Sequence, residues 1–129
     1  MKQEELIALS KQLAICDERH LVAKVVISYS DMAKVASVIV GGTPSAGREG
    51  FIGVYQDQLV CYESNLWGTK PEKEYFRISF EFIKETTIKK GFLGINNVFL
   101  IVAEGHKFKL FFTNKRKPII DQIQKILNK

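Results

Sequence analysis

The sequence predicts a mainly β fold: an antiparallel barrel or two-sheet sandwich of about seven strands, closed by a C-terminal amphipathic helix and preceded by an N-terminal helix. Three observations predict this fold class. From residue 50 onward, short runs of apolar and β-branched residues alternate with turn residues. No helical segment separates these runs, so antiparallel pairing is expected in place of parallel βαβ units. In residues 115–127, apolar residues recur at the spacing of one helix face.

The first two segments predict a helix and a strand. Between residues 3 and 15, three leucines fall on one face of a helix, which predicts an amphipathic helix packed on the rest of the protein or on a partner. Residues 21–29 follow as a β-branched run that only an alanine and Lys24 interrupt. This run predicts the first strand.

The segment of residues 30–40 fits two structures. Apolar residues recur there at helical intervals, and the pair Gly41-Gly42 can end a helix. Residues 35–40 also have the β-branched content of a strand. We favour the short helix, followed by a loop over residues 41–50 that is rich in glycine and small polar residues.

The middle of the chain predicts a hairpin and a long alternating strand. Residues 51–56 and 59–63 are joined by a polar tip, Gln56-Asp57-Gln58, that suits a tight turn. A polar loop is expected over residues 65–74. Residues 75–83 then alternate between apolar and polar side chains. Their apolar face consists of Phe76, Ile78, Phe80 and Phe82.

Three further strands and the closing helix complete the pattern. Residues 84–90 are charged and contain threonine, which is typical of a strand at a sheet edge. Residues 98–103 are apolar throughout, which predicts a strand buried on both faces. Residues 107–112 alternate, so their lysines face away from the apolar side chains that form the core. In residues 115–127, Pro118 fits only the first turn of the helix.

Length and composition indicate a single globular domain of 129 residues, 46% of them hydrophobic and 26% charged. We expect residues 1–20 to form a helical extension and residues 21–129 to form one globular unit. No apolar run reaches the ~18 residues that span a bilayer, and the start of the chain lacks the pattern of a signal peptide. Cys16 and Cys61 are therefore expected to be reduced, in a cytoplasm.

The net charge of +5 is unevenly distributed along the chain. Residues 1–65 carry six basic and eight acidic residues, a balance of −2, whereas residues 66–129 carry thirteen and six, a balance of +7. This asymmetry indicates either an anionic partner or a solvated surface that keeps the domain soluble. The candidate residues for contact with an anion or a partner are Arg48, Lys107, Lys109, Lys115, Arg116 and Lys117.

Four parts of the chain carry a family resemblance. They are the hairpin of residues 50–62, the stretch Phe76-Arg77-Ile78-Ser79, the turn Lys89-Lys90-Gly91-Phe92-Leu93-Gly94, and residues 107–112 leading into the terminal helix. Together these patterns of hydrophobicity and turn resemble bacterial pleckstrin-homology-like (PH/GRAM-like) domains. The resemblance covers residues 50–129 and, more loosely, residues 21–129.

The resemblance implies a non-catalytic binding or scaffolding module of a bacterial cytoplasm, with neither a cofactor nor a small-molecule substrate. It implies protein contact or self-assembly first, and weak contact with anionic lipid head groups second. Nucleic-acid binding is a third alternative, which rests on charge alone. In eukaryotic relatives, basic residues in the loop after the first strand hold phosphoinositide head groups. The corresponding residues 30–49 offer only Lys34 and Arg48, which departs from that pattern.

The sequence motifs predict neither an enzyme nor a metal site. Residues 42–49 have the glycine spacing of a phosphate-binding P-loop, but Arg48 and Glu49 stand where the motif requires Lys and then Ser or Thr. A strand also follows, in place of the helix that would hold a phosphate. We therefore predict that this segment binds no nucleotide. His20 and His106 share no metal-ligand spacing with either cysteine.

Overall fold

The computed structural model describes residues 2–28, 47–91 and 97–128. The two alternatives for residues 30–40 lie outside the described residues, as does most of the turn expected over residues 91–97. The elements in chain order are α1 (Gln3–Gln12), β1 (Val22–Ser28), β2 (Gly47–Tyr55), β3 (Gln58–Ser64), β4 (Pro71–Ser79), the 3-10 turn η1 (Phe80–Phe82), β5 (Ile83–Lys89), β6 (Asn97–Ala103), β7 (His106–Phe112), the 3-10 turn η3 (Asn114–Arg116) and α3 (Lys117–Leu127).

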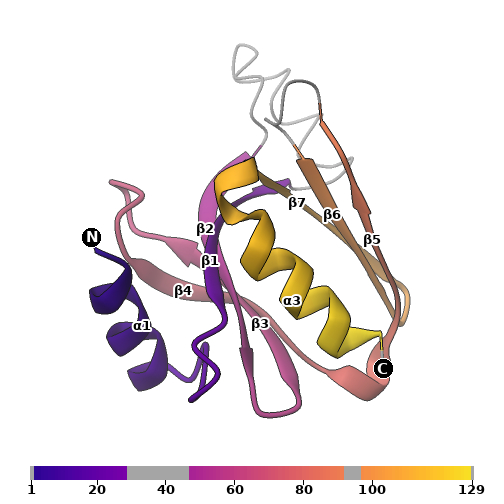
Figure 1. Cartoon of the computed structure of the whole chain (residues 1–129), viewed down its shortest axis with the longest axis horizontal. Helices are drawn as coiled ribbons and strands as arrows, with labels where there is room; N and C mark the ends of the chain where they lie inside the picture. Colours follow the sequence, from indigo (N-terminus) through magenta and orange to yellow (C-terminus); the bar gives the residue numbers. More distant parts are fainter. Residues whose placement is uncertain (1, 29–46, 92–96, 129) are drawn as a thin grey trace.

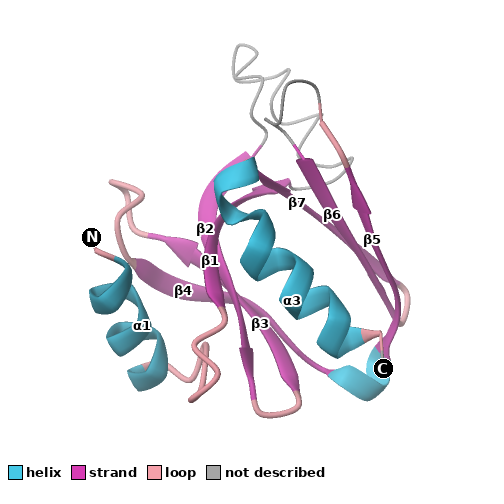
Figure 2. Cartoon of the chain, in the orientation of Figure 1, coloured by secondary structure: helices cyan, strands magenta, loops and turns pink. Residues whose placement is uncertain are grey.

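Within the described residues, seven antiparallel strands form one sheet in the order β4-β3-β2-β1-β7-β6-β5 (Figures 1 and 2). Strands that follow one another in the chain are paired within each half of the sheet, β1 to β4 and β5 to β7. The first and last strands join the halves, with Val26 opposite Phe111 and Ser28 opposite Lys109. With α1 before the sheet and α3 after it, the structure confirms the predicted fold class.

The main core lies between one face of the sheet and α3. Ile120 and Ile123 of α3 are completely buried among apolar side chains from both halves of the sheet. Figure 1 shows α3 crossing this face, and its C-terminal end is fixed to β5 by a hydrogen bond of 2.9 Å from Thr86 Oγ1 to Asn128 Oδ1. Pro118 stands in the first turn of α3, as the sequence predicts. Burial of one apolar stripe, more than helix propensity, therefore stabilises this helix.

The helix α1 covers the opposite face of β1, β2 and β3. Successive residues of a strand point to opposite faces, so Ala23 and Val25 enter the main core while Val22 faces α1. The small outer core consists of Leu6, Ile15, Cys16, Val22, Phe51 and Val60. Gly53 permits the close approach of the chain that follows α1, because a Cβ there would lie 2.5 Å from the carbonyl oxygen of Ile15.

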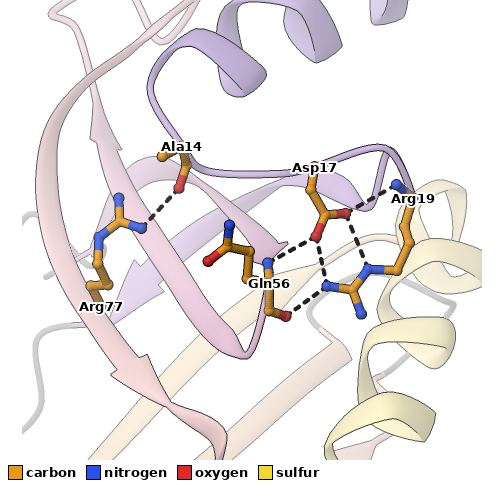
Figure 3. Close-up of polar contacts among 5 residues, drawn as sticks. All are labelled: Ala14, Asp17, Arg19, Gln56 and Arg77. Atoms are coloured by element: carbon orange, nitrogen blue, oxygen red, sulfur yellow. Dashed lines mark hydrogen bonds and ion pairs between the residues drawn. The ribbon is translucent and has the colours of Figure 1, made fainter.

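A polar network ties the segment after α1 to the tip of the β2–β3 hairpin (Figure 3). The carboxylate of Asp17 accepts hydrogen bonds from the backbone N–H of Gln56 at 2.8 Å and from the guanidinium of Arg19 at 2.8 and 3.1 Å. Arg19 Nη2 also donates to the carbonyl oxygen of Gln56 at 2.6 Å. Gln56 has a φ of 53°, in the left-handed region, so these contacts stabilise a strained turn residue.

On the other side of the same hairpin, Arg77 of β4 holds the end of α1. Its Nη1 donates to the carbonyl oxygen of Ala14 at 2.9 Å (Figure 3). The same Nη1 donates to Gln58 Oε1 at 3.1 Å, and Nε donates to Glu74 Oε1 at 2.9 Å. Ala14 has a φ of 58°, so the chain leaves the helix through a left-handed residue. Asp17 and Arg19 on one side of the hairpin and Arg77 on the other thus fix the position of α1 on the sheet.

The structure corrects the predicted limits of β4. The strand already begins at Pro71, inside the segment expected as a polar loop, because proline is tolerated at the first position of an edge strand. It ends at Ser79, where η1 turns the chain toward β5, so the predicted alternation through residue 83 is wrong. Phe82 is consequently 45% exposed and does not share the core face with Phe76.

The structure confirms β5 as an edge strand but corrects the prediction for β6. Burial alternates along β6, with Phe99 and Ile101 completely buried, and the apolar side chains between them only half-buried. The half-buried side chains are Val98, Leu100 and Val102. The prediction of burial on both faces is wrong because α1 covers β1 to β3 and does not extend over this half of the sheet.

Candidate anion-binding site

The six basic candidates from the sequence are distributed over separate parts of the molecule. Lys107 and Lys109 are exposed on β7, opposite Val102 and Leu100 of β6. The neighbouring Phe108, Leu110 and Phe112 pack in the main core, as alternation predicts. Lys109 Nζ lies 5.7 Å from the ring centroid of Phe111, on the same outer face.

Two of the candidates make contacts that support the fold. Lys117 forms an ion pair of 2.9 Å with Asp121, one turn further along α3. Arg48 lies in β2, where its Nη2 donates to the carbonyl oxygen of Ser64 at 3.0 Å and its Nη1 lies 4.0 Å from Glu63. Both cations are therefore at least partly neutralised by neighbours on the protein itself.

Lys115 and Arg116 have different surroundings, because η3 places them at a cavity of about 310 Å³. The cavity lies between α1, β1, β2, η3 and the loop that joins β3 to β4. Its lining residues are Gln3, Leu6, Lys24, Phe51, Gly68, Thr69, Lys115 and Arg116. We call it the basic cavity. Three cationic side chains from two separate segments line it.

The charges around the basic cavity are not balanced. Lys24 Nζ lies 3.3 Å from Glu49 Oε1, so one of the three cations has a partner. Lys115 and Arg116 form no ion pair within the part of the chain that the structure describes. A second cavity of about 240 Å³ shares Lys24 and Arg116 with the first, and Glu49 also lines it. Two cations thus remain available at the basic cavity for a negatively charged ligand.

The loop between β3 and β4 forms one wall of the basic cavity and is closed by its own hydrogen bonds. Asn65 Oδ1 accepts from the backbone N–H of Thr69 at 2.8 Å and of Lys70 at 3.2 Å. The backbone N–H of Asn65 donates to the Lys70 carbonyl at 2.8 Å. Gly68 has a φ of 71°, and a Cβ there would overlap the carboxylate of Glu49. The loop therefore presents Thr69 to the cavity in a defined position.

Sequence reasoning found Lys115 and Arg116 but missed three polar partners at the basic cavity. Gln3, Lys24 and Thr69 come from elements far apart in the chain, so no spacing pattern connects them. Lys24 nevertheless carried a signal, because it is the charged residue that interrupts the β-branched run of β1. A lysine in such a strand indicates that one of its faces reaches solvent or an anion.

The cysteine side chains are poorly placed for chemistry. Cys16 and Cys61 are both completely buried and unpaired. Burial raises the pKa of the Cys16 thiol to about 11, with a smaller contribution from Asp17, and burial also raises the pKa of Cys61. Within the described residues, no group of three His, Cys, Asp or Glu side chains is arranged to hold a metal ion.

The P-loop-like segment falls largely outside the described residues. Only its last positions are described, and they belong to β2, with Arg48 and Glu49 engaged in the contacts given above. The prediction that this segment binds no nucleotide stays a prediction.

Comparison with known proteins gives no match: neither a protein-family model nor a curated protein matches the chain. Among the described residues, none of the helices has the length and apolar character needed to cross a membrane. Only the fold and the arrangement of side chains therefore bear on the function.

Proposed function

We propose that the chain is a non-catalytic binding module that holds an anionic group, such as a phosphate, in the basic cavity. The observation that carries this proposal is the convergence of Lys24, Lys115 and Arg116 on one cavity. An arginine can donate two parallel hydrogen bonds to a phosphate, and lysines add point charges. Gln3 and Thr69 supply neutral polar groups at the same cavity.

The antiparallel sheet of seven strands with α3 across one face supports the further proposal that the chain is a PH/GRAM-like domain. The basic cavity differs in place from the loop after the first strand, which holds phosphoinositides in eukaryotic relatives. It lies instead beside α1, the element that the resemblance does not cover. A bacterial origin and a cytoplasmic location remain expectations from the sequence.

Titration with inorganic phosphate and pyrophosphate, followed by isothermal calorimetry or NMR shifts, tests the proposal. We expect binding that weakens as salt is raised, because partly exposed charges are screened within about 8 Å at physiological ionic strength. Arg116→Ala should weaken the binding severalfold. The matched control is Lys107→Ala, a charge change on the exposed surface of β7 that should leave it unchanged. Equal effects of the two variants would refute a localised site.

Protein contact or self-assembly is a second candidate, favoured by the outer apolar face of β6, which is only half-buried. Val98, Leu100 and Val102 lie there beside Phe111 of β7, with no helix over them among the described residues. Association through this face should be insensitive to salt, and Leu100→Lys should abolish it. Light scattering over a range of protein concentrations measures it directly, and a monomer at every concentration would remove self-assembly from consideration. Nucleic-acid binding rests on net charge alone.

A further inference from the structure

The loop between β3 and β4 carries two adjacent apolar side chains that point into solvent. Leu66 is 86% exposed and Trp67 is 79% exposed, the two highest values among the large hydrophobic residues described. Protein surfaces contain many single apolar residues, but a leucine and a tryptophan together at the tip of a loop are a prominent exception.

The exposure of this pair is built into the loop. The side chain of Asn65 bonds across the loop to Thr69 and Lys70, and the Gly68 N–H donates to the Asn65 carbonyl at 3.0 Å. These bonds close the loop without any help from Leu66 or Trp67. The two side chains therefore cannot turn inward to the core without breaking the network.

The same loop connects the apolar tip to the basic cavity. Gly68 and Thr69 line the cavity, and they directly follow Trp67 in the chain. Figure 1 shows this loop projecting at the same end of the molecule as the start of α1. Lys70 and Lys2, both exposed, add positive charge near these two segments.

Acidic groups lie nearby but do not cancel this charge. Glu49 is paired with Lys24, and Glu72 and Glu74 are exposed on β4, where Glu74 is held by Arg77 at 2.9 Å. Lys115 and Arg116 remain without ion pairs among the described residues. Glu4 and Glu5, in the first turn of α1, are exposed and do not line the basic cavity. An apolar tip therefore adjoins a cavity whose charged lining residues are all cationic.

We propose that this end of the molecule docks on an anionic lipid bilayer, with a lipid phosphate in the basic cavity and Leu66 and Trp67 inserted between the head groups. This inference rests on the proposed function, because it names the source of the anion. Tryptophan favours the membrane–water interface, where its ring is in an apolar layer and its N–H in a wet one. Basic residues are drawn to the negative surface of a bilayer.

The size of the apolar tip favours a bilayer over a protein partner. Stable protein interfaces bury about 800 Å² on each partner and rest on anchors set in a large patch. Here two adjacent apolar side chains project next to cations, with Phe82 of η1 as the other exposed large apolar residue in the described part of the chain. Such a small tip suits shallow insertion into a charged surface. If the tip instead enters a pocket on a protein partner, the Trp67 spectrum should not move on anionic vesicles, which is the result that refutes the membrane inference below.

Trp67 is the single tryptophan of the chain, so its fluorescence reports directly on the tip. We expect a blue shift and quenching by brominated lipid on vesicles of phosphatidylglycerol, and no change on vesicles of phosphatidylcholine. Raising the salt should reduce the binding. Leu66→Ser keeps the reporter and should weaken vesicle binding about tenfold. Arg116→Ala should weaken it about fivefold, the factor expected for one basic residue near an anionic surface.

The outcomes separate this inference from the function on which it rests. If Leu66→Ser binds inorganic phosphate as the unmodified chain does but loses vesicles, both proposals stand. If phosphate binds and the Trp67 spectrum does not move on anionic vesicles, the membrane inference is refuted and the anion site survives. If neither phosphate nor vesicles bind, both are refuted. Vesicle binding with an unmoved Trp67 spectrum refutes insertion of the tip.

Discussion

The closing helix offers the sharpest test of the fold, through the substitution Ile123→Ala. Ile123 is completely buried in the main core, where it packs with Ile120 and with side chains from both halves of the sheet. It lies in the middle of α3, away from Pro118 in the first turn. Alanine keeps or improves the helix propensity, so the substitution removes packing and leaves the backbone preference intact.

The expected cost follows from what is removed. Isoleucine loses three carbon atoms, and at about 0.8 kcal/mol for each the lost transfer free energy is about 2.4 kcal/mol. The strands on either side are held by their own hydrogen bonds and can close the hole only partly, so a cavity term is added. We therefore expect the free energy of unfolding to fall by about 3–4 kcal/mol, within the range measured for such truncations.

Urea unfolding followed by far-ultraviolet circular dichroism measures this change as a lower midpoint at an unchanged slope. Tryptophan fluorescence is a poor probe here, because Trp67 is largely exposed in the folded state. Gln122→Ala, an exposed position on the same helix, is the matched control and should change stability by less than about 0.5 kcal/mol. A loss below about 1 kcal/mol for Ile123→Ala would refute the claim that α3 closes the core.

Two further substitutions test the attachment of α1. The Arg19 guanidinium, followed by the backbone N–H groups of Arg19 and Gln56, holds the pKa of Asp17 far below its usual value. This stabilisation is complete above the unfolded pKa of about 4 and is lost as pH falls toward the folded pKa, so Asp17→Asn should cost about 1–2 kcal/mol at pH 7 and much less in acid. Gly53→Ala should lower the unfolding midpoint, because the added Cβ would lie 2.5 Å from the Ile15 carbonyl oxygen; an unchanged midpoint would mean that α1 is loosely attached.

Most of the fold could be predicted from the sequence, because a helix or strand that is buried on one face has apolar residues at a regular interval. The stripe that includes Ile120 and Ile123 predicted α3, and the alternation in residues 107–112 predicted which face of β7 enters the core. Both elements are half-buried, so the pattern of side chains records their orientation. The hairpin of β2 and β3 was likewise found from its polar tip.

The wrong predictions concern segments whose burial or turns depend on residues that are distant in the sequence. The unbroken apolar run of β6 predicted two covered faces, yet among the described residues no helix covers the outer face of that half of the sheet. Phe80 and Phe82 continue the period of β4, but the chain turns at Ser79 because Phe80 N–H bonds to the Asp57 carbonyl at 2.8 Å. A turn fixed by a residue more than twenty positions away leaves no signal in the strand itself.

The candidate site was harder to predict for the same reason. We chose Lys107, Lys109 and Lys117 as candidates because basic residues are dense in that part of the sequence. Lys24 was missed because it stands alone in its segment, and only the fold brings it to the basic cavity. At a rise of ~3.3 Å per residue, Lys107 near the start of β7 lies about 20 Å from Thr113, which directly precedes η3. Lys107 is therefore far from Lys115 and Arg116 in space although it is close to them in the sequence.

The position of α1 links the stability of the fold to the proposed site. Gln3 and Leu6 form one wall of the basic cavity, while Leu6 also belongs to the outer core with Val22 and Phe51. The Asp17 network and Arg77 hold the far end of the helix, so a change there alters the wall without touching a cationic residue. Any loss of anion binding in Asp17→Asn would therefore reflect displacement of the wall. The same loss in Arg116→Ala would reflect removal of charge, and only the latter should decrease the salt dependence of binding.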